Sequence, residues 1–144
     1  MNDNDKYYIK AVRASNWRSW YGDSVEWIPG NNLIEPNANP DPNKKCGRGL
    51  HCSKELLQAV KYQSGPSDYL YVDPIEIIAC DSDKIRCKSI NIIRALGKNE
   101  VDEIAGFCLW ECNHPVNPLL LEPKSIHYRH FAFLGQWASV GASV

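Results

Sequence analysis

Two neighbouring segments rich in β-forming residues constrain the fold of this chain more than any other feature. Residues 69–80 and 84–93 consist largely of isoleucine, tyrosine and other residues that favour strands. Residues 81–83 between them are Asp-Ser-Asp, which is typical of a turn. Pro74 cannot donate to a ladder and predicts a break or bulge in the first strand. The pattern therefore predicts a hairpin at the centre of a sheet. Its expected buried residues are Ile77, Ile85 and Cys87, and its expected solvent-facing side chains are Arg86 and Lys88.

Two helices are expected on either side of this hairpin. The first is predicted to begin at Ser53, a good N-cap, and to end before Gly65-Pro66. The second is predicted to begin at Asn99 and to end before Asn113. The expected buried faces contain Leu56, Leu57 and Val60 in the first helix, and Val101, Ile104, Ala105 and Cys108 in the second.

The remaining segments predict a single α+β domain over residues 1–144. Strands are expected over residues 6–13 and 24–28. Residues 29–47 are rich in proline and asparagine and predict a long loop, and the uncharged residues 138–144 predict a C-terminal tail. Because strands and helices do not alternate regularly, we expect a small mixed or antiparallel sheet with two or three packed helices.

The overall charge and composition exclude several classes of function. The chain has 16 Lys and Arg residues against 17 Asp and Glu residues, a net charge of −1, so no bulk positive field favours nucleic acid or an anionic membrane. No apolar run reaches the roughly 20 residues of a membrane span. The polar, acidic start does not resemble a signal peptide. These features predict a cytoplasmic protein whose partner is a protein or a small anionic ligand.

Six cysteines raise the question of disulfides or metal. Without a secretory signal we expect reduced thiols. Cys108 and Cys112 with His114, or Cys46 with the His51-Cys52 pair, would supply zinc ligands, but they are not paired on the tight turns that zinc ribbons use. We therefore expect no bound metal, and cysteines that act as small buried hydrophobic residues.

The segment from Cys46 to Ser53 is the most specific candidate for chemistry. Glycines flank Arg48 and would permit a close approach to a ligand. They lead into a short strand that ends near His51, just before the predicted helix at Ser53. A helix N-terminus favours an anion, and a neutral histidine beside it can donate a hydrogen bond or act as a general base. The candidate ligand-binding residues are Arg48, His51, Ser53 and Tyr62, and an ordinary β–α corner explains the same residues without a ligand.

Aromatic residues are concentrated near the N-terminus. Trp17, Trp20, Tyr21 and Trp27 fall within eleven positions, and few basic residues are interleaved with them. They are expected to form core, or a stacking wall for one small ligand.

Residues 46–96 resemble a small uncharacterised domain of phage and prophage proteins. The shared features are Gly49-Leu50-His51-Cys52-Ser53, Tyr62 at the end of the helix, and Asp83-Lys84-Ile85 in the hairpin. The resemblance implies an accessory binding domain and no particular activity.

Part of the same segment is also similar to ADP-ribosyltransferases of the poly-ADP-ribose polymerase type. Gly47-Arg48-Gly49-Leu50 followed by Tyr62 has the order of a strand and helix that bind nicotinamide in that family. The resemblance implies NAD as cofactor and a late catalytic glutamate, Glu111 or Glu122. No histidine precedes His51 to match the family's ribose-binding motif, which favours binding over catalysis. The two hypotheses are thus an accessory binding domain without a cofactor and a divergent NAD-dependent transferase.

Overall fold

The fold is α+β and consists mostly of one antiparallel five-stranded sheet. The computed structural model describes residues 6–21, 25–44 and 47–114. The strands are β1 (Tyr8–Arg13), β2 (Asn32–Ile34), β3 (Leu50–Cys52), β4 (Ser67–Cys80) and β5 (Ile85–Ala95), and the helices are α2 (Leu56–Val60), α3 (Lys98–Ala105) and α4 (Leu109–Asn113).

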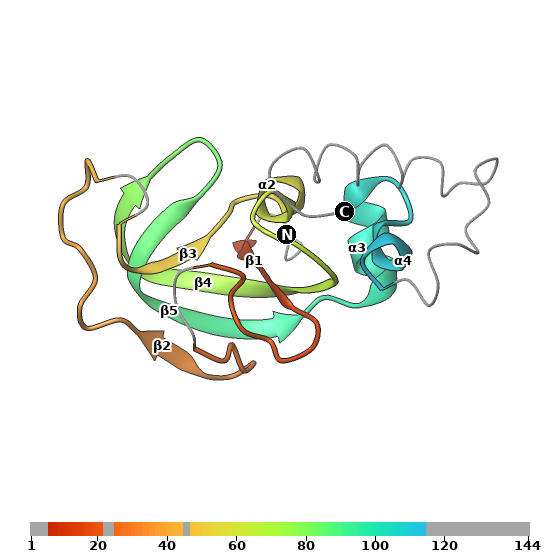
Figure 1. Cartoon of the computed structure of the whole chain (residues 1–144), viewed down its shortest axis with the longest axis horizontal. Coiled ribbons are helices and arrows are strands. Elements are labelled where there is room, and N and C mark those ends of the chain that lie inside the picture. Colours follow the sequence, from red (N-terminus) through yellow and green to blue (C-terminus); the bar gives the residue numbers. More distant parts are fainter. Residues whose placement is uncertain (1–5, 22–24, 45–46, 115–144) are drawn as a thin grey trace.

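Strand β5 organises the sheet. One of its edges pairs with β4 along most of its length, and β1 pairs with the far side of β4. The other edge of β5 pairs first with β3 and then with β2, so that the main order is β1-β4-β5-β2. Figure 1 shows α3 and α4 together at one end of the sheet and α2 above it.

An additional bridge joins β1 to the end of β3. The N–H of Ile9 donates to the carbonyl oxygen of Ser53 at 2.7 Å, and the N–H of Ser53 donates back to Ile9 at 2.9 Å. Because β3 also pairs with β5, the strands β1, β4, β5 and β3 form a closed ring. This closure places residues 50–53 beside the first strand, far from them in sequence.

The burial of β4 and β5 differs from the predicted pattern at two positions. Ile85 and Cys87 are buried, as predicted. Ile77 is 47% exposed, because the register of β4 against β5 shifts repeatedly beyond Pro74 and turns this half of the strand away from the core. Arg86 was expected to end in solvent and is instead 3% exposed. Lys88 is exposed as predicted.

Two apolar cores lie on the two faces of the sheet. Alternation along β4 sends Tyr69 and Tyr71 toward the helices and Leu70 and Val72 to the opposite face. The helix-side core contains Ile9, Leu56, Val60, Val101 and Leu109, and the opposite core contains Val12, Trp27, Leu50, Ile85, Ile90 and Ile92.

The helices begin at different residues from those predicted. The N-cap of α2 is Glu55, because Ser53 is held in its bridge to β1 and its hydroxyl donates to the carbonyl of Asp83 at 2.7 Å. Helix α2 is therefore only five residues long. Leu57, predicted to be buried, is 45% exposed.

Helix α3 has Gly97 as its N-cap instead of Asn99. The side chain of Glu100 accepts a hydrogen bond from the Gly97 N–H at 3.0 Å, which is the half of a capping box that a glycine N-cap allows. The helix ends at Gly106, whose φ of 81° is left-handed. The single helix predicted here therefore corresponds to two helices in the structure, because α3 ends at this glycine and α4 begins after it.

The segments between β1 and β3 also differ in part from the predictions. The expected strand at residues 24–28 is reduced to a single bridge between Arg18 and Glu26. The proline-rich segment 29–47 contains β2, in which Ile34 is 62% exposed. The predicted tail at 138–144 lies outside the described residues. Across the described ranges, none of the helices has the length and apolar character needed to cross a membrane.

Candidate functional site

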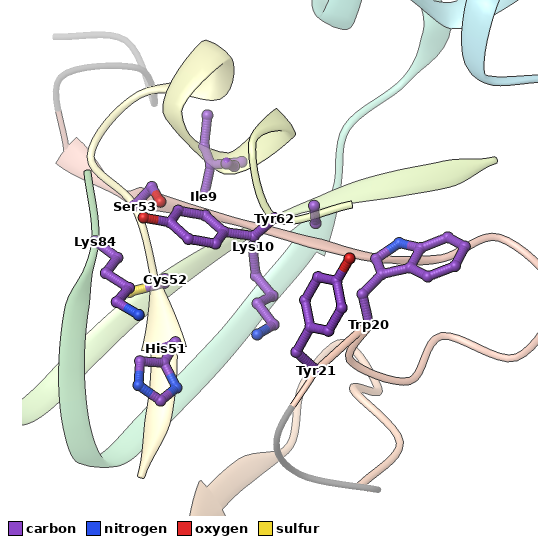
Figure 2. A pocket seen from close by; sticks show the side chains of 11 residues that line it. Ile9, Lys10, Trp20, Tyr21, His51, Cys52, Ser53, Tyr62 and Lys84 are labelled. Atoms are coloured by element: carbon purple, nitrogen blue, oxygen red, sulfur yellow. The ribbon is translucent and has the colours of Figure 1, made fainter. Parts of the chain in front are cut away.

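A pocket of about 320 Å³ opens where β1 and β3 separate from each other. The two strands are bridged at Ile9 and Ser53, and the residues next to this bridge line the pocket from both strands. Its size is within the range of small-molecule sites. The lining residues are Ile9, Lys10, Ala11, Trp20, Tyr21, His51, Cys52, Ser53, Ala59, Tyr62 and Lys84 (Figure 2).

Three of the four predicted ligand-binding residues meet in this pocket. His51 and Ser53 come from the β3 segment, and Tyr62 comes from the turn after α2. Arg48 does not line it. The Arg48 side chain is 64% exposed, and its Nε lies 3.2 Å from Oε1 of Glu35.

The glycines beside Arg48 make room for Arg86 and not for a ligand. A Cβ atom at Gly49 would lie 2.7 Å from Cγ of Arg86, and one at Gly47 would lie 3.0 Å from its Cζ. The buried guanidinium donates to main-chain carbonyl oxygens of the preceding loop and so holds residues 39–44 and Arg48 against β5. The acceptor carbonyls are those of Asn39, Asp41, Lys44 and Arg48.

His51 is a neutral group at the base of the pocket. It lies directly opposite Arg86 in the β3–β5 ladder. Its Nε2 is buried and has no hydrogen-bond partner among the described residues. Burial, followed by the charges of Lys10, Lys84 and Arg86, lowers the pKa of His51 to about 4. At neutral pH the ring therefore offers a nitrogen that can donate or accept, depending on its tautomer.

Two lysines bring positive charge to the same end of the pocket. The ammonium of Lys10 lies 4.7 Å from the ring centre of Trp27, and that of Lys84 lies 5.3 Å from the ring centre of Tyr62. Figure 2 shows both side chains directed toward the end that holds His51. No aspartate or glutamate is among the described residues that line the pocket. Sequence reasoning missed these lysines, because a single lysine in a strand or next to one is normally a solvated side chain.

The N-terminal aromatic residues divide between the core and the pocket. Trp27 is fully buried in the core. Trp17 donates through Nε1 to Oδ2 of Asp68 at 2.7 Å. Trp20 and Tyr21 line the pocket. The predicted core role is therefore confirmed for Trp27, and the role of a stacking wall for a ligand stays a prediction for Trp20 and Tyr21.

The aromatic wall is fixed in place by the turn that precedes β4. Nε1 of Trp20 donates to Oγ of Ser67 at 2.8 Å, and its ring packs so closely on Gly65 that a Cβ there would lie 2.7 Å away. The hydroxyl of Tyr21 shares a hydrogen bond with that of Ser64. The wall is thus held by contacts from a separate element, which favours a preformed site.

The cysteines act mainly as packed side chains. Burial raises the pKa of the Cys52 thiol well above its ordinary value, so Cys52 is protonated and a poor nucleophile at the pocket floor. Cys112 is buried in the helix-side core, whereas Cys80 is exposed. Nε2 of His114 lies 2.8 Å from Oδ1 of Asp68. Within residues 6–21, 25–44 and 47–114, no three histidine, cysteine or acidic side chains gather as a metal site would require.

The sequence matches the model of a domain of unknown function, DUF7666, over residues 9–104. The chain belongs to the DUF7666 family. The matched residues begin in β1 and end in α3, so they include every residue that lines the pocket. No curated protein and no solved structure shows a significant match to the chain.

Proposed function

We propose that this DUF7666 chain is a cytoplasmic binding domain for a small anionic ligand, held in the pocket between β1 and β3. The observation that carries the proposal is the pairing of Lys10 and Lys84 around a neutral His51, with no carboxylate among the described lining residues. A carboxylate or phosphate placed between two ammonium groups forms charge-assisted hydrogen bonds, which are stronger than neutral ones.

The opposite end of the pocket suits a flat, apolar group. Trp20 and Tyr21 border it, and Tyr62 lies between the two ends, with the Lys84 ammonium 5.3 Å from its ring centre (Figure 2). Aromatic rings of this kind stack on planar ligands. The buried nitrogen of His51 adds one directional hydrogen bond between the charged and aromatic ends. The expected ligand therefore combines a negative group with a ring.

Titration of the ¹⁵N-labelled protein with adenosine 5′-monophosphate and with inorganic phosphate tests this proposal. We expect the amide signals of β1, β3 and residues 62 and 84 to shift on addition of the nucleotide. Lys10→Ala and Lys84→Ala should each weaken its binding about tenfold or more, which corresponds to about 1.4 kcal/mol. Lys88→Ala on the exposed face of β5 is the matched control, and Arg48→Ala should also bind normally. Absence of any shift with millimolar amounts of both probes, or equal losses in the control, would contradict the proposal.

A divergent NAD-dependent ADP-ribosyltransferase is the second candidate. It is favoured by Tyr62, which reaches the same pocket as the β3 strand, as the resemblance requires. Of the two glutamates considered for catalysis, Glu111 lies on α4 beside Lys98 at 3.8 Å and does not line the pocket, and Glu122 lies outside the described residues. Incubation with NAD distinguishes the candidates, since an enzyme would release nicotinamide and a binding domain would leave NAD intact.

A further inference from the structure

A second pocket, of about 220 Å³, meets the first one at two shared side chains. His51 and Lys84 line both pockets. The second pocket lies under the loop at residues 42–44 and over the ends of β4 and β5 that face it. The two pockets therefore adjoin at these side chains.

The second pocket carries an excess of positively charged side chains. Lys44, Lys84 and Arg86 line it, against one acidic residue, Asp81. The guanidinium of Arg86 donates four hydrogen bonds to main-chain carbonyls of the loop. Because none of these four acceptors is a carboxylate, these bonds do not neutralise the charge of Arg86. The side chain of Asp81 accepts from the N–H of Ser82 at 2.7 Å. Such an environment suits an extended anion.

The two pockets differ in the chemistry that they offer. The first provides aromatic side chains from Trp20, Tyr21 and Tyr62, and the second provides no aromatic side chain from the described residues. The boundary between them is His51 with the ammonium group of Lys84, which is where the charge of a bound ligand is expected. The first pocket therefore offers aromatic surfaces for a ring, and the second offers charged side chains for an anionic group.

We infer that the ligand has two parts, a planar ring in the first pocket and a chain of at least two phosphate groups that passes His51 and enters the second pocket. This inference rests on the proposed function and specifies its ligand as a compound of the nucleoside diphosphate class. A monophosphate would reach Lys10 and Lys84, and only a longer chain would reach Lys44.

Isothermal titration calorimetry with the full chain tests the inference. The probes are the four common ribonucleosides, their 5′-monophosphates, their 5′-diphosphates and pyrophosphate. We expect the best-fitting diphosphate to bind at least tenfold more tightly than its monophosphate, and more tightly than pyrophosphate alone. Lys44→Ala should remove most of the gain from the second phosphate and leave monophosphate affinity within twofold. Lys10→Ala should weaken both nucleotides.

The possible results separate this inference from the proposed function. Monophosphate binding with no gain from the second phosphate, or an equal loss of both nucleotides in Lys44→Ala, would overturn the two-part ligand and leave the first pocket as a site. Pyrophosphate that binds as tightly as every diphosphate would also overturn it, since the ring would then contribute nothing. Failure of all probes would contradict both proposals. Lys88→Ala serves as the lysine control and should match the unmodified protein.

Discussion

His51 links the candidate site to the stability of the fold. Its pKa is lowered from 6.5 to about 4, first by burial and then by neighbouring cations. Between these two values the unfolded chain binds a proton that the folded chain does not, so folding becomes less favourable as the pH falls. The contribution of His51 to the free energy of unfolding is therefore fully present above pH 6.5 and decreases as the pH falls to 4. At 1.36 kcal/mol per pKa unit, the total decrease is up to about 3 kcal/mol.

Urea denaturation of the protein and of His51→Asn, at several values between pH 7 and pH 4, measures this contribution. Asparagine does not titrate, and the other titrating groups are the same in both proteins. We therefore expect the difference in unfolding free energy between the two to change steadily over this range, with the histidine protein losing more stability in acid. A difference that stays constant from pH 7 to pH 4 would mean that His51 titrates normally.

At the scale of elements, the two isoleucines of the β4–β5 pair show how the register shift sets the energetics. Ile85 is 2% exposed and packs in the core, whereas Ile77 is 47% exposed. Ile85→Ala should lower the free energy of unfolding by about 2–5 kcal/mol through lost burial and a residual cavity. Ile77→Ala makes the same chemical change at an exposed site and should cost below about 1 kcal/mol. Chemical denaturation of both variants checks the pair, and equal losses would contradict the register described for β4.

Local sequence was sufficient for some elements because runs of β-forming residues mark a strand whichever of its faces is buried. Strands β1, β3 and β5 lie where residue patterns predicted them. Ser53 was assigned to a helix cap because local spacing does not reveal its partner, Ile9, which lies 44 positions earlier. Likewise, Gly49 appeared to serve a ligand because nothing nearby in sequence indicates Arg86. Contacts between distant segments cannot be derived from periodicity alone.

The candidate site was predictable to a similar extent. His51 and Tyr62 were found because both belong to one continuous segment that carries an unusual pattern of glycine, histidine and tyrosine. Lys10 lies in β1, before that segment, and Lys84 directly precedes β5, after it. Only the closure of the sheet at the Ile9–Ser53 bridge brings these lysines to His51. The charge of the site is thus a property of the fold.

At the scale of the whole molecule, a buried ring of hydrogen bonds joins α4 to Gln63 and Tyr69, which lie far from it in sequence. The hydroxyl of Tyr69 on β4 donates to Oε1 of Gln63 at 2.5 Å, and Nε2 of Gln63 donates to Oδ1 of Asn113 at 2.6 Å. Nδ2 of Asn113 donates back to the Tyr69 hydroxyl at 2.6 Å. The ring attaches α4, which lies beyond the residues matched to DUF7666, to the sheet within them.

Tyr69→Phe tests how strongly this ring couples α4 to the rest of the molecule. The variant keeps the aromatic ring but removes one donor and one acceptor from fully buried surroundings, where lost hydrogen bonds are expensive. We expect the free energy of unfolding in urea to fall by about 1–3 kcal/mol.

Tyr7→Phe is the control, because half-buried Tyr7 packs against Tyr71 through its ring. This variant should lower the free energy of unfolding by less than about 0.5 kcal/mol. Tyr69, Gln63 and Asn113 do not themselves line the pocket, so nucleotide affinity should be unchanged in both variants. Equal stability of Tyr69→Phe and Tyr7→Phe would show that apolar packing of Leu109 and Cys112 alone holds α4 in place.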